Sequence, residues 1–399
     1  MRTLVLTNRP VMLWRHGYDL RVANLCRHLD GERHLMVIPL QAPDRRPATI
    51  DPRTCFDTVI ELPVDFVGGL SWRRHFRLSD ANFLKRAAPR AFKDAVNHLR
   101  RRVADVGATH LVVFGGHLAE IAREAGCDAT LFDVCDSSAL TLRRRLQFAG
   151  GRPWSPSRWR SGLELMRLGG LEAGLPRWFR AVTTINEADS NEVRRLAGHG
   201  ARNVHTVPNG VADVFLQPLD DTPRRRGVAF WGNLHFPPNA AALRHFMQDI
   251  YVPHLRQHDV EVAIAGENPP DWLRDIASSD PNVKVLGYVD DLAAAVRHHA
   301  VMINPMLLGS GMKNKVLEAF GLGLAVVSTG LGMESVPQAV DGQHWLQAEQ
   351  PADFAEAVRS LLDDEPRRRR ISTAANRLVH EHYRWNVVSR RFQTLLQQA

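Results

Sequence analysis

Lysine, cysteine and long apolar runs are scarce in this sequence. The four cysteines form no Cys-x-x-Cys pair and have no histidine at ligand spacing, so we expect reduced thiols rather than a disulfide framework or a zinc site. The longest apolar runs, such as residues 301–308, fall well short of the ~20 residues that span a bilayer. The N-terminus reaches polar residues at once, which is untypical of a secretory leader. We therefore expect a soluble, cytoplasmic protein.

What remains is the composition of a folded enzyme. Of the 399 residues, 44% are hydrophobic and 24% are charged. At roughly 100–200 residues per domain, this length predicts two or three domains with cores of their own. Wholesale disorder and a disulfide-dependent mini-protein are therefore excluded.

Positive charge is concentrated in the first half of the chain. The 51 Lys and Arg residues exceed the 43 Asp and Glu residues by 8, and residues 1–200 hold 31 of the basic and 21 of the acidic side chains. Arginine supplies nearly all of it, in runs at 73–74, 100–102 and 143–145, because the chain has only five lysines. Such a surface could attract nucleic acid, an anionic membrane or a phosphorylated substrate; equally, the arginines could form solvated helix faces.

Apolar runs typical of buried strands alternate with charged, helical stretches. This alternation predicts stacked βαβ units and parallel sheets. We expect helices near residues 18–29, 80–106 and 315–321. Strands are expected at Thr3–Leu6, His34–Pro39, His110–Phe114, Ala129–Asp133, Ala181–Thr184, Thr206–Val211 (a short strand that ends in a Pro-Asn-Gly turn), Val228–Trp231, Val260–Ala265, Val283–Leu286, Ala300–Asn304 and Ala325–Ser328.

A polar stretch without apolar period at residues 220–227 divides this pattern, and we interpret residues 213–227 as a linker. It separates an N-terminal domain at 1–212 from a C-terminal domain at 228–380. Both are expected to be α/β domains, Rossmann-like and doubly wound, that face each other across a cleft. In such sheets ligands bind beyond the carboxyl ends of the strands, so the cleft is the expected active site.

The most specific chemical pattern is the segment 304–321. Gly309 and Gly311 allow backbone N–H groups to approach a ligand closely, and the N-terminus of the helix that follows favours a phosphate or diphosphate. Lys313 and Lys315, two of the five lysines, add positive charge there. Glu318 could accept hydrogen bonds from a ribose diol. A purely structural strand–turn–helix is the alternative, and the concentration of a scarce residue type argues against it.

Several common nucleotide and metal motifs are missing. The chain has no Walker A sequence, and Asn314 stands where a dinucleotide Gly-x-Gly-x-x-Gly motif would need its last glycine. No Asp-x-Asp pair is present to chelate a metal on a sugar diphosphate. We therefore predict activity without metal or cofactor, with the leaving-group charge stabilised by lysines, backbone N–H groups and the helix end.

The segments beyond residue 180 resemble the GT-B glycosyltransferases, particularly the family-four enzymes (glycosyl transferases group 1) with their Glu-x7-Glu signature. The resemblance extends over nearly the whole chain and implies transfer of a sugar from a nucleotide-sugar donor that the C-terminal domain binds. The segments that carry it are 183–189, 207–211, 230–234, 237–239, 265–266, 286–291 and 309–321.

The resemblance also assigns roles to residues. It implies that Gly232 begins the loop near the diphosphate, that Lys313 and Lys315 hold the phosphates, and that Glu318 holds the ribose. A C-terminal helix, residues 381–399, is expected to return to the N-terminal domain. The donor-binding residues expected are Gly232, Asn233, Gly266, Tyr288, Val289, Gly309, Ser310, Gly311, Met312, Lys313, Lys315 and Glu318.

The chain departs from the family pattern at two places. Ser310 stands where the first acid of Glu-x7-Glu belongs, so the usual carboxylate contact to the donor sugar is missing. Gly232 is followed by Asn233-Leu234 instead of a basic pair, which Lys313 and Lys315 could replace. The family implies retention of the anomeric configuration, and these departures leave inversion as an alternative.

The acceptor side is expected in the N-terminal domain. His16 and Gly17 could form a loop that faces the cleft. Asp133 or Asp136 could act as general base on an acceptor hydroxyl; alternatively, each could cap the helix that follows. His117 is the other catalytic candidate, although a structural role fits it equally well.

We therefore predict a metal-independent, retaining hexosyltransferase that acts on a saccharide or lipid-linked saccharide in exopolysaccharide or cell-envelope biosynthesis. The basic half predicts peripheral contact with the inner face of an anionic membrane. The alternatives are a glycosyltransferase that modifies nucleic acid, a GT-B epimerase, and a plain nucleic-acid-binding protein. The last is disfavoured because the arginine runs lack interleaved aromatics and a recognised module.

Overall fold

The computed structural model describes residues 1–12, 17–40, 49–62, 84–127, 129–148, 156–198, 201–216 and 227–399. The chain forms two compact units. Unit 1 comprises Met1–Asn209 and Trp385–Ala399, and unit 2 comprises Gly210–Arg384. Most of the expected linker, the arginine run at 73–74 and His16 lie outside the described residues.

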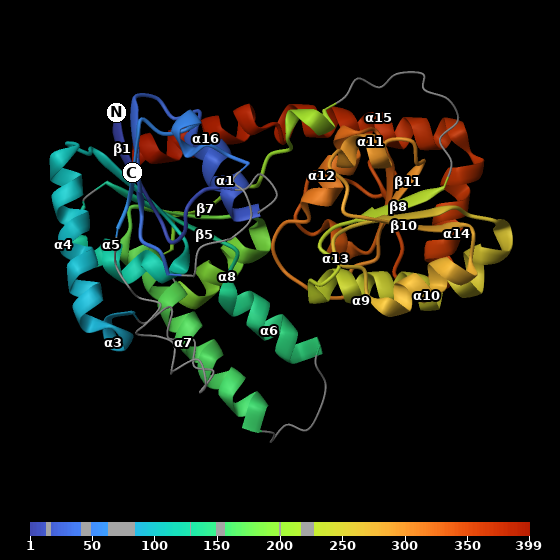
Figure 1. Ribbon diagram of the computed structural model, residues 1–399, viewed down its shortest axis with the longest axis horizontal. Coiled ribbons are helices and arrows are strands. Elements are labelled where there is room, and N and C mark those ends of the chain that lie inside the picture. The colour runs from blue at the N-terminus through green and yellow to red at the C-terminus, as the bar shows by residue number, and fades with distance from the viewer. Residues whose placement is uncertain are drawn as a thin grey trace. The chain divides into compact units, whose positions relative to one another are not determined.

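Unit 1 is built on a parallel sheet of seven strands in the order β3-β2-β1-β4-β5-β6-β7. The order reverses direction between β1 and β4, which makes the fold doubly wound (Figure 1). The strands are β1 (Arg2–Thr7), β2 (Glu32–Val37), β3 (Thr58–Glu61), β4 (His110–Phe114), β5 (Thr130–Cys135), β6 (Ala181–Thr184) and β7 (Val204–Thr206).

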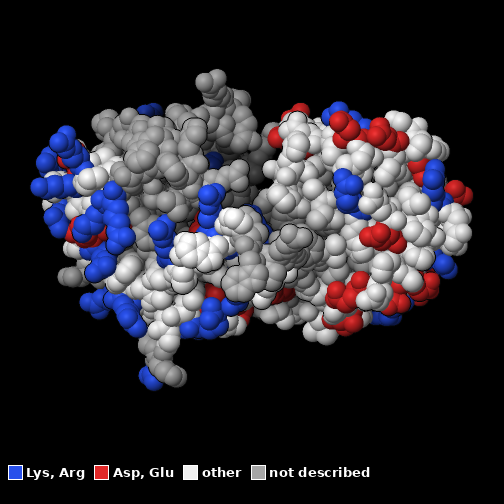
Figure 2. Space-filling view, turned by 90° about the horizontal axis from the view of Figure 1, so that it is seen from below, with Lys and Arg blue, Asp and Glu red and all other residues white. Residues whose placement is uncertain are grey.

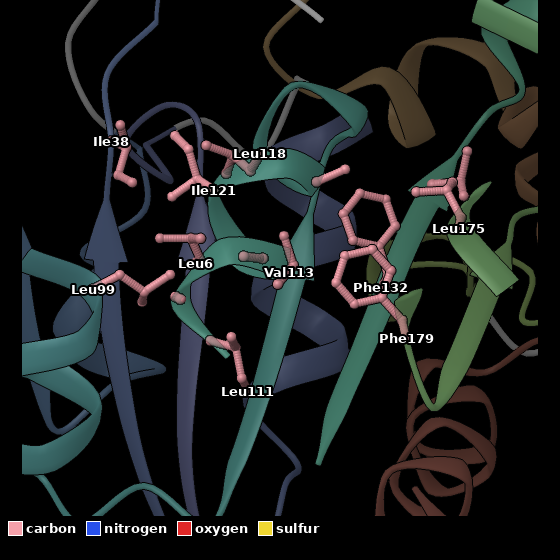
Figure 3. Close-up of a cluster of buried hydrophobic side chains, with 14 of the residues drawn as sticks. Leu6, Ile38, Leu99, Leu111, Val113, Leu118, Ile121, Phe132, Leu175 and Phe179 are labelled. Atoms are coloured by element: carbon pink, nitrogen blue, oxygen red, sulfur yellow. The ribbon is translucent and has the colours of Figure 1, made fainter. Parts of the chain in front are cut away.

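Helices cover both faces of this sheet, because alternate side chains of each strand point to opposite faces. Leu4 and Leu6 of β1 enter one core, and Val5 between them enters the other. In the first core, Phe132 stacks on Phe179 with ring centroids 4.7 Å apart (Figure 3). The helices are α1 (Gly17–Cys26), α3 (Leu84–Ala87), α4 (Pro89–Asp105), α5 (Ala119–Ala125), α6 (Ser138–Phe148), α7 (Pro156–Trp178), α8 (Glu187–Ala197) and α16 (Trp385–Gln398), with short turns η1 (Pro52–Thr54) and η4 (Gly116–Leu118).

Unit 2 is built on a parallel sheet of six strands in the order β10-β9-β8-β11-β12-β13, which reverses between β8 and β11. The strands are β8 (Val228–Trp231), β9 (Val262–Ala265), β10 (Val283–Gly287), β11 (Val301–Asn304), β12 (Ala325–Ser328) and β13 (Leu346–Gln347). The helical segments are η5 (Asp213–Phe215), α9 (Pro237–His245), η6 (Phe246–Leu255), η7 (Arg256–His258), α10 (Asp271–Ser279), α11 (Leu292–Val296), α12 (Asn314–Gly321), α13 (Gly330–Met333), α14 (Pro351–Asp363) and α15 (Glu365–His382).

Strand alternation again divides the packing of unit 2. Val228 and Phe230 of β8 enter the core that η6 and α14 cover. Ala229 and Trp231 enter the core that α12 and α15 cover. Each unit is therefore a Rossmann-like, doubly wound α/β fold, as the sequence predicted.

The prediction of one long helix over residues 80–106 is corrected by the structure. The structure has two helices there, α3 and α4, joined at Ala88. Pro89 occupies the first turn of α4, where its missing N–H costs no hydrogen bond. The same residue cannot continue a helix that arrives from before it, because the ring clashes with the preceding turn. Residues 80–83 lie outside the described part.

No helix of the described residues combines the length and apolarity needed to cross a membrane.

Candidate functional site

The turns after β8 and β9 approach each other closely beside the reversal point of the unit 2 sheet, which lies between β8 and β11. Gly232 follows β8 and Gly266 follows β9. A Cβ on Gly266 would lie 2.1 Å from the carbonyl oxygen of Gly232, so a side chain there would collide with backbone. The two glycines therefore allow a backbone approach at the sheet edge where ligands of this fold class bind.

Lys315 of α12 reaches the turn after β8 through Asn239. The Lys315 ammonium donates to Asn239 Oδ1 at 2.8 Å, and Asn239 Nδ2 donates to the carbonyl oxygen of Asn233 at 3.0 Å. A Cβ on Gly232, whose φ is +148°, would lie 2.9 Å from Asn239 Nδ2 and 3.5 Å from Lys315 Nζ. The predicted residues Gly232, Asn233 and Lys315 are thus brought together, and Asn239 joins them.

Lys315 is a buried cation whose direct contacts, an amide oxygen and an aromatic ring, are neutral. Its Nζ lies 4.1 Å from the centroid of the Phe230 ring, where the π face favours positive charge. Burial lowers the pKa of Lys315 to about 7, an effect that Glu318 opposes and Lys313 reinforces. Among the described residues, no carboxylate pairs with it within 4.0 Å. An anion bound here would supply the missing countercharge.

Lys313 lies at the N-cap position of α12. Its side chain gives the first turn no capping hydrogen bond, and its ammonium donates to the carbonyl oxygen of Gly311 at 3.2 Å. Gly309 and Gly311 have φ of +119° and +71°, which only glycine adopts readily. The loop therefore places two lysines and the positive end of an eight-residue helix at one edge of the sheet.

Glu318 is held by Trp231, the last residue of β8. The indole Nε1 donates to Glu318 Oε2 at 2.6 Å. Burial raises the pKa of Glu318, while the Trp231 hydrogen bond and Lys315 lower it. The indole occupies one carboxylate oxygen and leaves the other for a ligand hydroxyl. Trp231 and Asn239 were missed as site residues, although both lie in segments that carry the family resemblance.

Comparison with known families gives a match within unit 2. Residues 225–364 match the family model described as glycosyl transferases group 1. Most of unit 2 is therefore similar to these enzymes. No curated protein sequence matches the chain.

Several solved structures are similar in fold to the whole chain, not to unit 2 alone. Sucrose-phosphate synthase from Thermosynechococcus elongatus aligns with a TM-score of 0.71 at 14% identity, covering 100% of this chain and 99% of that one. HepE of Anabaena in complex with UDP aligns with a TM-score of 0.67 at 12% identity, covering both chains completely. A glycosyltransferase from Rickettsia africae aligns with a TM-score of 0.66 at 10% identity, covering 100% and 98%.

The remaining predicted donor residues lie around the same edge of the unit 2 sheet. Tyr288 is exposed, and its hydroxyl donates to Asp290 Oδ1 at 3.1 Å. Val289 packs against the core beside it. Ser310 and Met312 lie in the loop between β11 and α12. An exposed aromatic ring beside the turn after β10 suits stacking on a nucleotide base.

The sheet of unit 1 also has a reversal point, between β1 and β4. Asn8 follows β1, and Gly115, with φ of +97°, follows β4. A Cβ on Gly115 would lie 3.6 Å from Asn8 Nδ2, and the Tyr18 hydroxyl donates to the carbonyl oxygen of Phe114 at 3.1 Å. The predicted His117 lies in η4 directly after this turn and is half-buried.

The predicted acceptor residue Gly17 opens α1, one residue after the undescribed His16. The unit 1 switch point therefore gathers Gly115 and His117, while the expected His16 contribution stays a prediction.

The expectation that Asp133 serves as a general base needs correction. Asp133 is fully buried, and both its oxygens are bonded: Arg21 Nε donates to Oδ1 at 3.1 Å, Arg21 Nη2 donates to Oδ2 at 2.6 Å, and Thr183 donates to Oδ2 at 2.7 Å. A carboxylate enclosed in this way does not face an acceptor hydroxyl, which a general base must reach. Its role is structural.

Asp136 differs from Asp133 because its side chain is exposed. It follows Cys135, whose φ of +61° turns the chain sharply at the end of β5. Ser137 caps α6, with its Oγ accepting from the backbone N–H of Leu140 at 3.0 Å. Asp136 and His117 therefore stay the candidates for acid–base chemistry, at the ends of β5 and β4.

Proposed function

We propose that the protein transfers a hexosyl unit from a uridine diphosphate sugar to an acceptor hydroxyl. The carrying observation is Lys315, a buried cation without a carboxylate partner among the described residues, beside the Gly232 turn of a unit that is similar to group 1 glycosyltransferases. Uridine diphosphate is the first choice because the Anabaena structures of similar fold contain UDP and UDP-glucose.

The proposed donor site assigns the diphosphate to the loop before α12. Lys315 and Lys313 would compensate its two negative charges, and the N-terminal amides of α12 would stabilise the charge that develops on the leaving group. Glu318 would accept hydrogen bonds from the ribose, and Tyr288 would contact the base. This set of cations supports a reaction without a metal, and activity that survives EDTA would support it further.

For the acceptor, we propose a saccharide or lipid-linked saccharide of exopolysaccharide or cell-envelope biosynthesis, with His117 or Asp136 as the acid–base residue. Support comes from the basic character of unit 1. In the face shown by Figure 2, Lys and Arg side chains are dense on unit 1, and Asp and Glu side chains are prominent on unit 2. We propose retention of the anomeric configuration, which NMR of the product tests.

A thermal-shift panel tests the donor assignment directly. Uridine, UDP, UDP-glucose, GDP and ADP are compared at matched concentrations. A ligand at a hundredfold excess over Kd adds about 2.7 kcal/mol to the free energy of unfolding. We expect UDP and UDP-glucose to raise Tm and uridine to raise it far less. If no nucleoside diphosphate raises Tm, the proposal is contradicted. If the protein interconverts UDP-sugars in the absence of an acceptor, the epimerase alternative is favoured.

A further inference from the structure

The helical hairpin of α6 and α7 in unit 1 has an unusual composition. Residues 137–163 contain six arginines and no acidic residue. They also contain three aromatic residues. Arg158, near the start of α7, donates to the carbonyl oxygen of Leu146 in α6 at 3.3 Å, which ties the two helices together.

The outer part of α7 exposes a row of apolar side chains. Trp159 is 72% exposed and Met166 is 67% exposed. They lie seven residues apart, and half-buried Leu163 lies between them, so all three share one helix face. Arg160 and Arg167, both exposed, repeat the same spacing one residue further along. The row is thus apolar and bordered by cations.

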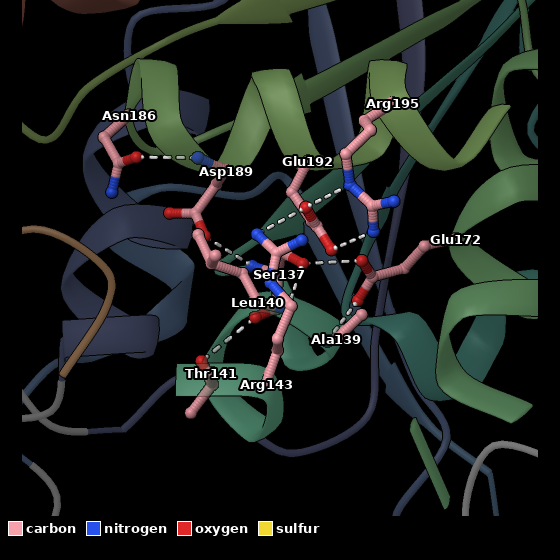
Figure 4. Close-up of polar contacts among 10 residues, drawn as sticks. All are labelled: Ser137, Ala139, Leu140, Thr141, Arg143, Glu172, Asn186, Asp189, Glu192 and Arg195. Carbon is pink, nitrogen blue, oxygen red and sulfur yellow. Dashed lines mark hydrogen bonds and ion pairs between the residues drawn. The ribbon is translucent and has the colours of Figure 1, made fainter. Parts of the chain in front are cut away.

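The inner part of the hairpin is fixed to unit 1. Glu172 of α7 is buried and accepts from Ser137 Oγ at 2.6 Å and from the backbone N–H of Ala139 at 3.1 Å (Figure 4). Leu171 and Leu175 enter the core. Figure 1 shows α7 extending from this base to an end that lies well away from the sheet. The exposed face is therefore carried on a firmly anchored helix.

We infer that the outer face of α7, defined by Trp159, Leu163 and Met166 with Arg160 and Arg167, docks on an anionic lipid bilayer. Tryptophan prefers the boundary between water and hydrocarbon, and methionine and leucine can enter the acyl region. The bordering arginines match negatively charged headgroups. Nucleic acid is the weaker match, because two of the three apolar side chains are aliphatic and cannot stack on bases. The inference adds a surface to the proposed function and does not depend on the nucleotide sugar.

The test is flotation of the full-length protein with vesicles of phosphatidylcholine alone or with 30% phosphatidylglycerol. We expect binding only to the anionic vesicles, decreasing as salt is added. Each arginine near such a surface contributes about a fivefold change in partition coefficient, so Arg160→Gln with Arg167→Gln should weaken binding about 25-fold. Trp159→Ser should weaken it further, and Trp159→Phe should retain most of it.

The matched control removes two exposed arginines from another helix of the same basic unit. Arg90→Gln with Arg101→Gln on α4 makes the same change in net charge, and we expect an effect of less than about threefold. All variants should keep the wild-type Tm and UDP response, so loss of vesicle binding is separable from failure of the donor site.

Three results would overturn the inference. One is equal binding to neutral and anionic vesicles, or none to either. Another is wild-type binding by the Arg160→Gln, Arg167→Gln variant. The third is a protein that does not float with vesicles and uses this face for something else. It would either bind an oligonucleotide through the α6–α7 hairpin or form a dimer that Trp159→Ser abolishes.

Discussion

Two buried charge clusters, one in each unit, differ in how completely they are partnered. In unit 1, Arg21 bonds both oxygens of Asp133, and its Nη1 donates to Asn209 Oδ1 at 3.1 Å and to the carbonyl oxygen of Pro208 at 3.3 Å. In unit 2, the Lys315 ammonium contacts the amide oxygen of Asn239 and the Phe230 ring. Burial lowers the pKa of Arg21, but the charge and hydrogen bonds of Asp133, together with Cys135 and Asp136, raise it overall. For Lys315 burial prevails and the pKa is lowered.

This difference separates a structural charge from a binding charge. A cation that is fully hydrogen-bonded by carboxylate and carbonyl partners has no donor left for a ligand. Removing one of these partners leaves a buried, unpaired charge and destabilises the fold. A cation among neutral groups carries an uncompensated desolvation cost, which an incoming anion relieves. Burial alone does not distinguish the two, but the set of partners does.

The largest expected effect is a loss of stability when Arg21 is left buried without its carboxylate partner. Asp133→Ala should lower the free energy of unfolding of unit 1 by about 3–5 kcal/mol, because a buried guanidinium loses its countercharge. Urea unfolding followed by circular dichroism measures it.

The control for that substitution is Asp136→Ala, at the exposed neighbour, which should change stability by less than about 0.5 kcal/mol. The double replacement Arg21→Met with Asp133→Leu should recover most of the loss, because no unpaired charge remains. Equal losses at Asp133 and Asp136 would contradict the structural assignment.

Lys315→Met tests whether the Lys315 ammonium serves ligand binding rather than stability. It should leave the fold intact and weaken UDP binding about 10- to 100-fold, since a hydrogen bond to a charged group contributes about 1.5–3 kcal/mol. Isothermal titration calorimetry with UDP and with uridine separates the diphosphate contribution, and only UDP should lose affinity. The exposed Lys284→Met serves as control. A UDP affinity unchanged in Lys315→Met would refute the phosphate assignment.

The depressed pKa of Lys315 predicts opposite pH trends for binding and stability. Above pH 7 the lysine of the free protein loses its proton, so UDP affinity should fall, by at most about tenfold per pH unit. Stability of the free protein should rise from about pH 7 to 10.5, because there the unfolded chain holds a proton that the folded chain has released.

The variant Lys315→Arg isolates that titration, because its guanidinium stays charged and UDP ionises identically in both proteins. Its UDP affinity, measured from pH 6 to 9, should lack the fall seen for the wild type. Parallel profiles for the two proteins would mean that another group titrates.

The smallest expected effect concerns the orientation of Glu318. Trp231→Phe removes the indole N–H but keeps an aromatic ring, and it should weaken UDP binding about 3- to 10-fold. A double-mutant cycle with Glu318→Gln measures the coupling. Additive effects would show that Trp231 acts through packing alone.

The sequence predicted the fold well because buried parallel strands are recognisable apolar runs. β4, β6, β8 and β12 have the predicted bounds. Two strands were not predicted: β3 (Thr58–Glu61), half polar at a sheet edge, and the two-residue β13. The short strand expected from Thr206 lies at Val204–Thr206 instead. Short edge strands lack the continuous apolar run that marks the others.

Sequence reasoning grouped candidate residues that are close together in the chain and missed contacts between residues that are far apart. The lysines and glycines of 309–315 share one loop, so spacing alone indicates their cooperation. Trp231 and Glu318 are 87 positions apart, and Arg21 and Asp133 are 112 apart. Only the folded sheet brings such pairs together, so the sequence alone leaves Asp133 open as either a general base or a helix cap.

The path of the chain through the two units constrains the order in which they can form. Unit 2 is a continuous insertion within unit 1, whose second core contains Trp385, Val388 and Phe392 of α16. Phe392 stacks on Phe114 with centroids 6.1 Å apart. During synthesis, unit 2 can fold as soon as it emerges, whereas the α1 side of unit 1 keeps an open apolar face until the last helix leaves the ribosome. Deletion of α16 should therefore destabilise unit 1 before unit 2, although most of unit 1 is synthesised first.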